Sequence, residues 1–257
     1  MLLLFSIGFI RLRIMVQRYG DANNNSPQLF GISLYQQKNI ELKLQGRRPF
    51  DARALFYDHR LPHPNTPYLS QIPCSWGAVY FPEHWREFHE YLAIRFSEYS
   101  ISIDEDIVPD VRSNRWARSW KKYFIELVYL RGYAMLYPNY ADFVSFSTNH
   151  LEVGSHVKDR PNDVYLQRKE LFLLPLMLLF DNINSSMPSG ILDLPGETLP
   201  PWHSLPVLNL TGSLTSFQAL IDQGRTRRTE LRRCPGTPSS AYNVRDLMCI
   251  NDSPSAA

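Results

Sequence analysis

Residues 113–138 read SNRWARSWKKYFIELVYLRGYAMLYP and decide the class of fold. The apolar positions that recur at helical spacing in this stretch are Trp116, Trp120, Phe124, Leu127 and Leu130. Such a stripe, with basic residues on the other side, predicts an amphipathic helix. Ser113 or Asn114 is the expected N-cap, and Gly132 is the expected C-terminal cap.

Three apolar runs around this helix are typical of buried strands. They are Leu29–Tyr35 (LFGISLY), residues 74–81 (CSWGAVYF) and Tyr133–Tyr137. A further helix is predicted over residues 83–98, with Pro82 in its first turn, where proline is well accommodated. The alternation of strand, helix and strand favours an α/β fold, a mixed sheet with flanking helices.

The chain divides into three predicted regions. Residues 1–28 hold an apolar segment and a polar loop, and residues 29–234 form the folded region. Residues 235–257 are rich in Ser, Pro and Asn, which predicts a disordered tail. Within the folded region, residues 36–71 read as an irregular connection and residues 187–206 as an extended one, both rich in proline.

Composition excludes several classes of protein. The chain has 257 residues, of which 44% are hydrophobic and 20% charged, as in a globular protein and unlike a disordered or collagen-like one. Lys and Arg number 27 and Asp and Glu number 25, so the formal charge is +2. This balance gives no global electrostatic reason to bind nucleic acid, and we expect no such partner.

The N-terminal apolar run Leu2–Ile10 is too short to span a bilayer. It also lacks the leading positive charge of a signal peptide, because Arg11 and Arg13 follow it. Three interpretations stay open: a buried strand or short helix, a weak membrane-surface segment, and the start of an incomplete gene product.

The three cysteines are Cys74, Cys234 and Cys249, and no CxxC pair occurs. This spacing disfavours a structural zinc site or a redox motif. Cys74 lies in an apolar segment and is expected to be a buried, inert thiol. A disulfide between Cys234 and Cys249 is an alternative for an oxidising compartment.

Two segments carry candidate chemistry. An acidic cluster consists of Asp104, Glu105, Asp106 and Asp110. Its oxygen ligands suit a divalent cation, but a solvated turn before a helix is the favoured interpretation. The second segment is FSTNHLEVGSH, residues 146–156, in which His150 and Glu152 suit a metal ligand or an acid/base pair. A capped turn is the alternative there.

Other conspicuous residues have structural explanations. We expect structural or surface roles for His59, His63, His84 and His89. A last helix is predicted from Ser213 to about Arg233, and its run of arginines reads as a solvated helix end, with an anionic contact as the alternative. The common phosphate-loop, zinc-protease and hydrolase signatures are absent from the sequence.

Several long, aromatic-rich blocks carry a resemblance to a known family. They are LFGISLY, PYLSQIPCSWGAVYFPEHWREFHEYL, SWKKYFIELVYLRGYAMLYPNY, FSTNHLEVGSH and LPVLNL. From Leu29 to about Cys234 the chain resembles the C-terminal part of uncharacterised, family-2-like glycosyltransferase proteins of fungi and plants. The order of strand, two helices, Gly132-Tyr133, a short strand and His150 also resembles the closing part of GT-A glycosyltransferases.

This resemblance implies a partial GT-A-like fold and a set of roles. His150 would contact a divalent cation, manganese or magnesium, or the diphosphate of a nucleotide sugar. Trp76, His150 and Glu152 would contact the sugar, and a core position is the alternative for Trp76. The usual Glu-Asp pair before the second helix is missing, so Asp106 and Asp110 are the nearest candidates for the catalytic base, with Glu152 as a further catalytic carboxylate.

The resemblance also implies what is missing. An Asp-x-Asp metal motif should precede LFGISLY, and the preceding 28 residues contain none. The chain would then be the acceptor-side half of a nucleotide-sugar-dependent transferase, acting on a glycan acceptor, with a secretory-pathway (Golgi) location. The alternative is a non-catalytic carbohydrate- or protein-binding module derived from that family. A membrane-surface scaffold, weakly attached through the N-terminal apolar run, is a third hypothesis.

Overall fold

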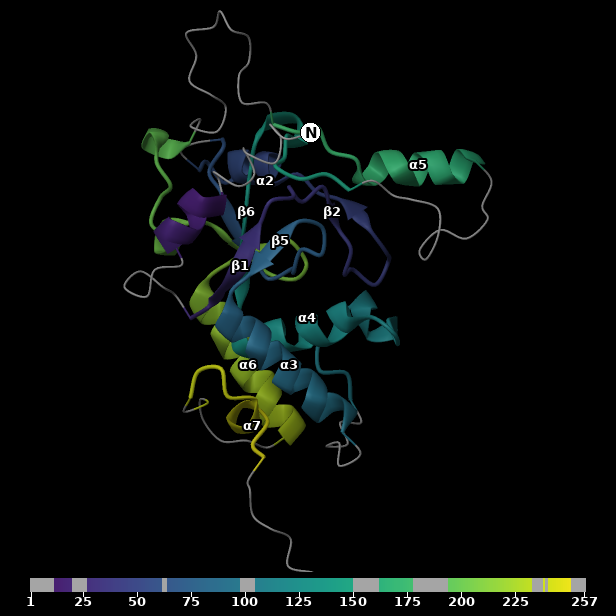
Figure 1. Cartoon of the computed structure of the whole chain (residues 1–257), viewed down its shortest axis with the longest axis vertical. Helices are drawn as coiled ribbons and strands as arrows, with labels where there is room; N and C mark the ends of the chain where they lie inside the picture. The colour runs from purple at the N-terminus through teal and green to yellow at the C-terminus, as the bar shows by residue number, and fades with distance from the viewer. Residues whose placement is uncertain are drawn as a thin grey trace, which may run out of the picture.

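A six-stranded mixed sheet forms the centre of the computed structural model (Figure 1). Its strands, in spatial order, are β5 (Ala78–Tyr80), β1 (Leu29–Ser33), β6 (Ala134–Tyr137), β4 (Tyr68–Ser70), β7 (Val207–Leu208) and β8 (Leu214–Thr215). The pairs β1–β6 and β4–β7 are parallel, and the other pairs are antiparallel. The predicted α/β fold with a mixed sheet and flanking helices is therefore confirmed.

The structure describes residues 12–19, 27–61, 64–97, 105–149, 162–177, 194–232, 238 and 240–250. Besides the sheet, it contains a small two-stranded sheet of β2 (Asn39–Ile40) and β3 (Arg48–Pro49). Short 3-10 helices span Arg112–Arg115, Ala141–Phe143, Pro195–Glu197 and Trp202–Ser204. Among these residues, no helix has the length and apolar character that crossing a membrane requires.

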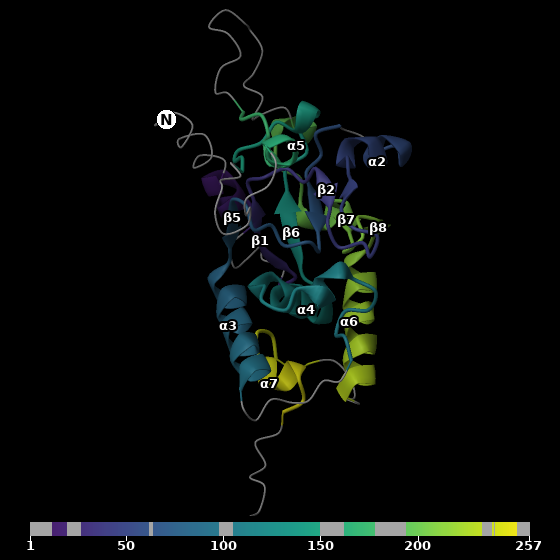
Figure 2. The same ribbon diagram turned by 90° about the vertical axis from the view of Figure 1, so that its right-hand side faces the viewer.

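The helices gather at two ends of the molecule (Figure 2). At one end lie α3 (Pro82–Phe96), α4 (Trp120–Arg131), α6 (Phe217–Arg232) and α7 (Val244–Leu247), with α4 between α3 and α6. At the other end lie α2 (Ala52–Asp58) and α5 (Asn162–Phe172). A further helix covers residues 12–19.

Both faces of the central strands are buried. Met135 and Tyr137 of β6 belong to one hydrophobic core, which includes residues of α3 and α4. Ala134 and Leu136, which alternate with them, belong to a second core with residues of the helix over 12–19. This alternation of side chains explains why β6 reads as a continuous apolar run.

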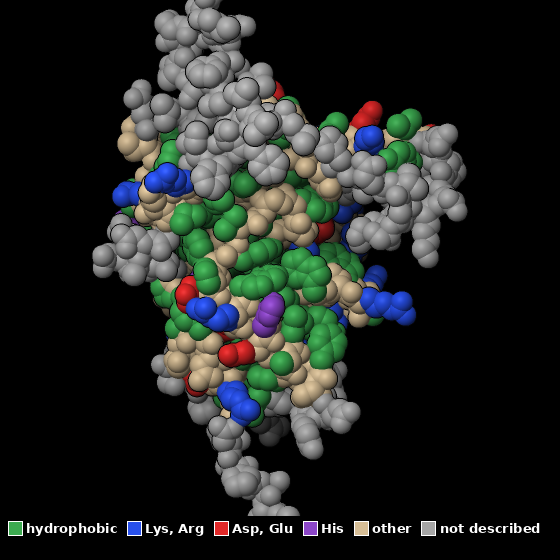
Figure 3. Space-filling view, in the orientation of Figure 1, with side chains coloured by type: hydrophobic (Ala, Val, Ile, Leu, Met, Phe, Trp, Pro, Cys, Tyr) green, Lys and Arg blue, Asp and Glu red, His purple; other side chains and the backbone are tan. Residues whose placement is uncertain are grey.

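Hydrophobic side chains also reach the surface. Figure 3 shows them gathered over the face where β1, β5, α3 and α4 lie. Phe96 of α3 is 65% exposed and Trp120 of α4 is 42% exposed.

The helix predicted to start at Ser113 or Asn114 starts later. Residues 112–115 form a 3-10 turn, Trp116 leaves the helical region with φ −91° and ψ 68°, and α4 begins at Trp120 after the extended Ser119. The Asn114 side chain donates to the backbone oxygen of Val108 instead of capping a helix. Gly132 ends α4 in the left-handed conformation with φ 68°, as predicted.

The amphipathic pattern predicted for α4 is also wrong in its second half. Every residue from Phe124 to Leu130 is buried, including Glu126. The helix has neighbours on several sides because α3, α6 and the sheet all pack on it. The predicted helix over residues 83–98 is confirmed, with Pro82 as its first residue.

The connection over residues 36–71 is not irregular. It contains β2, β3, α2 and β4, and Asp51 caps α2 by accepting from the backbone nitrogens of Arg53 and Ala54. The three residues of β4 are fully enclosed between β6 and β7. So short a strand is defined by its distant partners, which sequence periodicity does not report.

The predicted disordered tail is wrong for residues 240–250. There α7 brings Val244, Leu247 and Met248 into the core. Arg228, predicted to be at a solvated helix end, is only 3% exposed and donates to the backbone oxygen of Leu247 at 2.7 Å. The apolar run Leu2–Ile10 lies outside the described residues.

Candidate functional site

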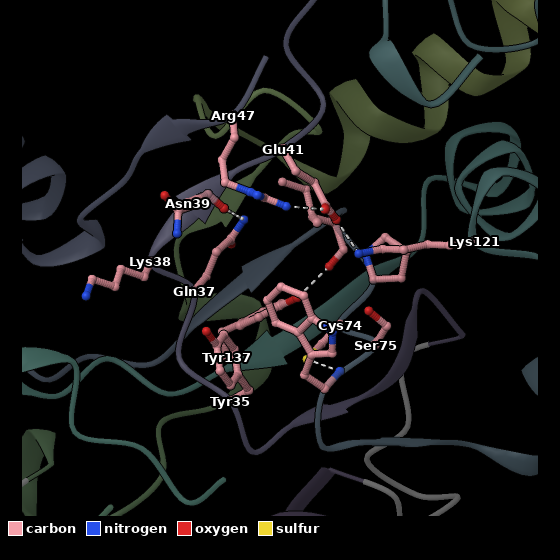
Figure 4. Close-up of a pocket in the computed structure, with 13 residues that line it drawn as sticks. Tyr35, Gln37, Lys38, Asn39, Glu41, Arg47, Cys74, Ser75, Lys121 and Tyr137 are labelled. Atoms are coloured by element: carbon pink, nitrogen blue, oxygen red, sulfur yellow. Dashed lines mark hydrogen bonds and ion pairs between the residues drawn. The ribbon is translucent and has the colours of Figure 1, made fainter. Parts of the chain in front are cut away.

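A small pocket lies where loops from three parts of the chain meet beside β6 (Figure 4). The segment after β1 contributes Tyr35 and Gln37, and the segment around β2 contributes Glu41. The loop between β4 and β5 contributes Trp76, and α4 contributes Lys121. We call this hollow, of about 40 Å³, the Trp76 pocket.

A carboxylate held between two cations forms one wall of the pocket. Glu41 accepts a hydrogen bond from Lys121 and lies 3.8 Å from the guanidinium of Arg47. Burial by itself raises the pKa of Glu41, but the charge and hydrogen bond of Lys121, with Arg47 and Arg112, bring it below its ordinary value. Glu41 is therefore an ionised hydrogen-bond acceptor at neutral pH.

Two aromatic rings form another wall. Tyr35 is buried and meets Trp76 edge to face, with ring centroids 5.3 Å apart and an interplanar angle of 77°. The Trp76 side chain is half-buried. Burial above all, with the nearby Cys74, raises the pKa of Tyr35, so the tyrosine is neutral.

The loop that carries Trp76 is fixed by its neighbours. Ser147 donates from its hydroxyl to the backbone oxygen of Trp76 at 3.2 Å, and Leu34 donates its backbone N–H to Gly77 at 2.7 Å. Gly77 has φ 92°, and a Cβ there would lie 2.3 Å from Ser147 Oγ. Only glycine satisfies both conditions, so Gly77 sets the position of the Trp76 ring.

The pocket also contains an unsatisfied acceptor. Gln37 donates from Nε2 to the backbone oxygen of Asn39 at 3.4 Å. Its Oε1 is buried and has no hydrogen-bond partner among the described residues. Because a buried polar atom without a partner is costly, a ligand hydroxyl that donated to Gln37 Oε1 would make binding more favourable.

Cys74 is buried and is a free thiol, as predicted. Its Sγ accepts from the backbone nitrogen of Trp76 at 3.4 Å. Burial, the largest influence, raises its pKa, so the thiolate that a nucleophile requires is disfavoured. Cys249 is disulfide-bonded, and Cys234 lies outside the described residues.

The predicted site residues are not all brought together. Trp76 lines the pocket, whereas Asp106 and Asp110 are exposed and line no part of it. Instead, the backbone oxygen of Asp106 accepts from Arg227 at 2.6 Å. His150 and Glu152 lie outside the described residues, so their predicted roles remain predictions.

The pocket does not fit a divalent cation. Glu41 is the only carboxylate among its described lining residues, and Lys121 and Arg47 already occupy it. In the part of the chain that the structure describes, no three His, Cys, Asp or Glu side chains gather as metal ligands would. Manganese or magnesium binding therefore stays a prediction attached to His150.

Sequence reasoning missed the charged residues of the pocket. Glu41 and Arg47 lie in the stretch that read as an irregular connection, and Lys121 read as part of a polar helix face. Glu41 and Lys121 are 80 positions apart in the chain, and neither belongs to a motif with fixed spacing. Only the tertiary fold, which brings the β2 region beside α4, places them together.

Of the other predictions, His84 has the expected structural role. It is 1% exposed, and its Nε2 lies 2.9 Å from the backbone oxygen of Pro27.

Comparison with known proteins gives one match. A family model described as the SPBC1E8.03c C-terminal domain matches residues 51–101, which include α2, β4, the whole loop that carries Trp76, β5 and α3. No curated protein and no solved structure matches the chain. The match is to part of the chain and carries no link to glycosyltransferases.

Proposed function

We propose that the chain binds a carbohydrate at the Trp76 pocket and acts as a non-catalytic binding module. One observation carries the proposal: an ionised carboxylate fixed by two cations lines the same pocket as a partly exposed tryptophan. A sugar ring presents hydroxyls at its edge and C–H groups on its faces. The pocket offers charged and amide acceptors for the hydroxyls and an aromatic ring for the C–H groups.

The polar groups match a ligand with both donors and acceptors. Glu41 and Gln37 Oε1 accept hydrogen bonds, while Lys121 and Arg47 donate them. Because Glu41 is already held in place, a hydroxyl that binds it requires little rearrangement of the site. Preorganisation of this kind lowers the cost of binding.

The size of the pocket favours binding one ring edge over enclosing a donor substrate. Its volume of about 40 Å³ is well below the roughly 300–1,000 Å³ typical of sites that enclose small molecules. A nucleotide sugar would lie mostly outside it, whereas the edge of one sugar can enter.

The chemistry of Glu41 also favours binding over catalysis. A general base works best when its pKa is near the working pH, and the pKa of Glu41 is lowered. Asp106 and Asp110, the bases that the sequence predicts, are not lining residues.

A pair of adjacent arginines provides the test. Arg47→Gln removes a charge of the pocket, and Arg48→Gln removes an exposed charge from the neighbouring position, which does not line it. We expect saturation-transfer NMR with methyl hexosides and short oligosaccharides to show binding, weakened about tenfold by Arg47→Gln, the loss of one charge-assisted hydrogen bond. Arg48→Gln should bind like the original chain, and equal weakening by both variants would contradict the proposal.

One observation favours a second candidate, the acceptor-side half of a transferase. The order β5, α3, α4 ending at Gly132, and β6 is the order that the glycosyltransferase resemblance implies. In that case His150, Glu152 and a divalent cation would meet the nucleotide sugar. A manganese-dependent rise in melting temperature with a nucleoside diphosphate would support this candidate. Glycan binding without any metal or nucleotide effect would support the binding module.

A further inference from the structure

A second cavity, of about 180 Å³, lies between the C-terminal end of α4, α6 and the residues Pro238, Ser240 and Ala241. It shares no lining residue with the Trp76 pocket. Three arginines line it: Arg131 from the end of α4, and Arg225 and Arg228 from successive turns of α6. Among its described lining residues, none is acidic.

Two of the three guanidinium groups are held in place by residues that do not line the cavity. Arg131 forms an ion pair of 2.5 Å with the buried Glu87 and donates to the backbone oxygen of Asn243 at 2.9 Å. Arg228 is anchored by the backbone oxygens of Leu247 and Asp246, at 2.7 and 3.3 Å. These bonds fix the charges before any ligand arrives.

Arg225 retains hydrogen-bonding capacity. Its Nη1 lies 3.3 Å from Asp222, and that pair is largely solvent-exposed, so the attraction between its charges is weak. Its Nε is buried and has no hydrogen-bond partner among the residues that the structure describes. A buried donor without a described partner, in a cavity that two other arginines also line, is a costly arrangement that an anion would relieve.

The positive charges also oppose one another. Burial is the main reason that the pKa of Arg228 is lowered, and the charge of Arg131 lowers it further, while Asp246 acts in the opposite direction. A bound dianion would offset both the burial and the mutual repulsion.

We infer that this cavity binds a phosphate group. Planar guanidinium groups pair with phosphate oxygens through two parallel hydrogen bonds, and three arginines line one small cavity here. The phosphate is either the free ion or the end of a small phosphorylated molecule. The inference does not depend on carbohydrate binding at the Trp76 pocket.

The test uses the full chain and two probes, inorganic phosphate and glycerol phosphate, titrated calorimetrically against sodium chloride of equal ionic strength. We expect saturable binding of at least one probe. Tighter binding of inorganic phosphate identifies the free ion as the ligand, and tighter binding of glycerol phosphate identifies a phosphorylated molecule. Heats no larger than those of sodium chloride for both probes would overturn the inference.

The decisive variants are Arg225→Gln and its matched control Arg86→Gln. Both residues pair with a carboxylate three positions earlier on an exposed helix face, but Arg86 does not line the cavity. We expect Arg225→Gln to weaken phosphate binding at least tenfold, and Arg86→Gln to leave it within twofold. Arg225→Lys, which keeps the charge and loses the planar fork, should bind with intermediate affinity. Equal effects of Arg225→Gln and Arg86→Gln would show non-specific screening and overturn the inference.

Discussion

At the scale of single residues, the burial of His84 makes the free energy of unfolding depend on pH. It is 1% exposed on α3, and burial, its largest influence, lowers its pKa to about 4, although the hydrogen bond with Pro27 acts in the opposite direction. The unfolded chain takes up a proton near the ordinary value of 6.5, so protons favour the unfolded state between pH 6.5 and 4. The stability present above pH 6.5 is therefore lost as the pH falls towards 4.

This loss of stability at low pH can be measured by urea unfolding at pH 7 and pH 5. The original chain should lose about 2 kcal/mol more of its free energy of unfolding over that interval than His84→Gln, in which an amide nitrogen replaces Nε2. His89→Gln, an exposed histidine of the same helix, is the control and should keep the full loss. An identical loss in His84→Gln and the original chain would show that His84 does not cause the dependence.

At the scale of elements, the crossing of α4 and α6 depends on Gly224. A Cβ at this position would lie 2.4 Å from the backbone oxygen of Leu130 and 2.6 Å from that of Tyr129. Gly224→Ala should force the helices apart and lower the free energy of unfolding by about 1–3 kcal/mol, despite the better helix propensity of alanine. Thr226→Ala, at an exposed position of α6, should be neutral or slightly stabilising in the same denaturant titration.

At the scale of the whole molecule, α7 closes the core from the end of the chain. Leu247 is fully buried there, and α7 packs on α3. Leu247→Ala should therefore lower the free energy of unfolding by about 2–4 kcal/mol, measured by urea titration. Leu44→Ala, at a position that is 42% exposed, should cost much less. Equal costs would mean that α7 does not pack as described.

The sequence predicted some elements of the fold but not others, and the difference follows from the range of the interactions that define each element. Local sequence signals predicted β1, β6 and α3 well. The apolar runs mark the two strands, Pro82 marks the start of α3, and Gly132 ends the helix that precedes β6, so each signal lies in or next to the element it defines. Local signals failed for β4, whose three residues are defined by β6 and β7. Local sequence signals also did not predict the Trp76 pocket, of which only Trp76 itself was a predicted site residue. Glu41 and Lys121 meet only through the tertiary fold.

The most direct test of carbohydrate binding follows the indole N–H signals of the chain's five tryptophans in a ¹⁵N–¹H NMR titration with saccharide. The Trp76 signal is assigned by its loss in Trp76→Phe. We predict that saccharide shifts the Trp76 signal in a saturable manner and leaves that of Trp202, in the opposite core, unchanged. Binding that leaves the Trp76 signal in place, or no binding by any saccharide, would contradict the assignment of the Trp76 pocket as a carbohydrate site.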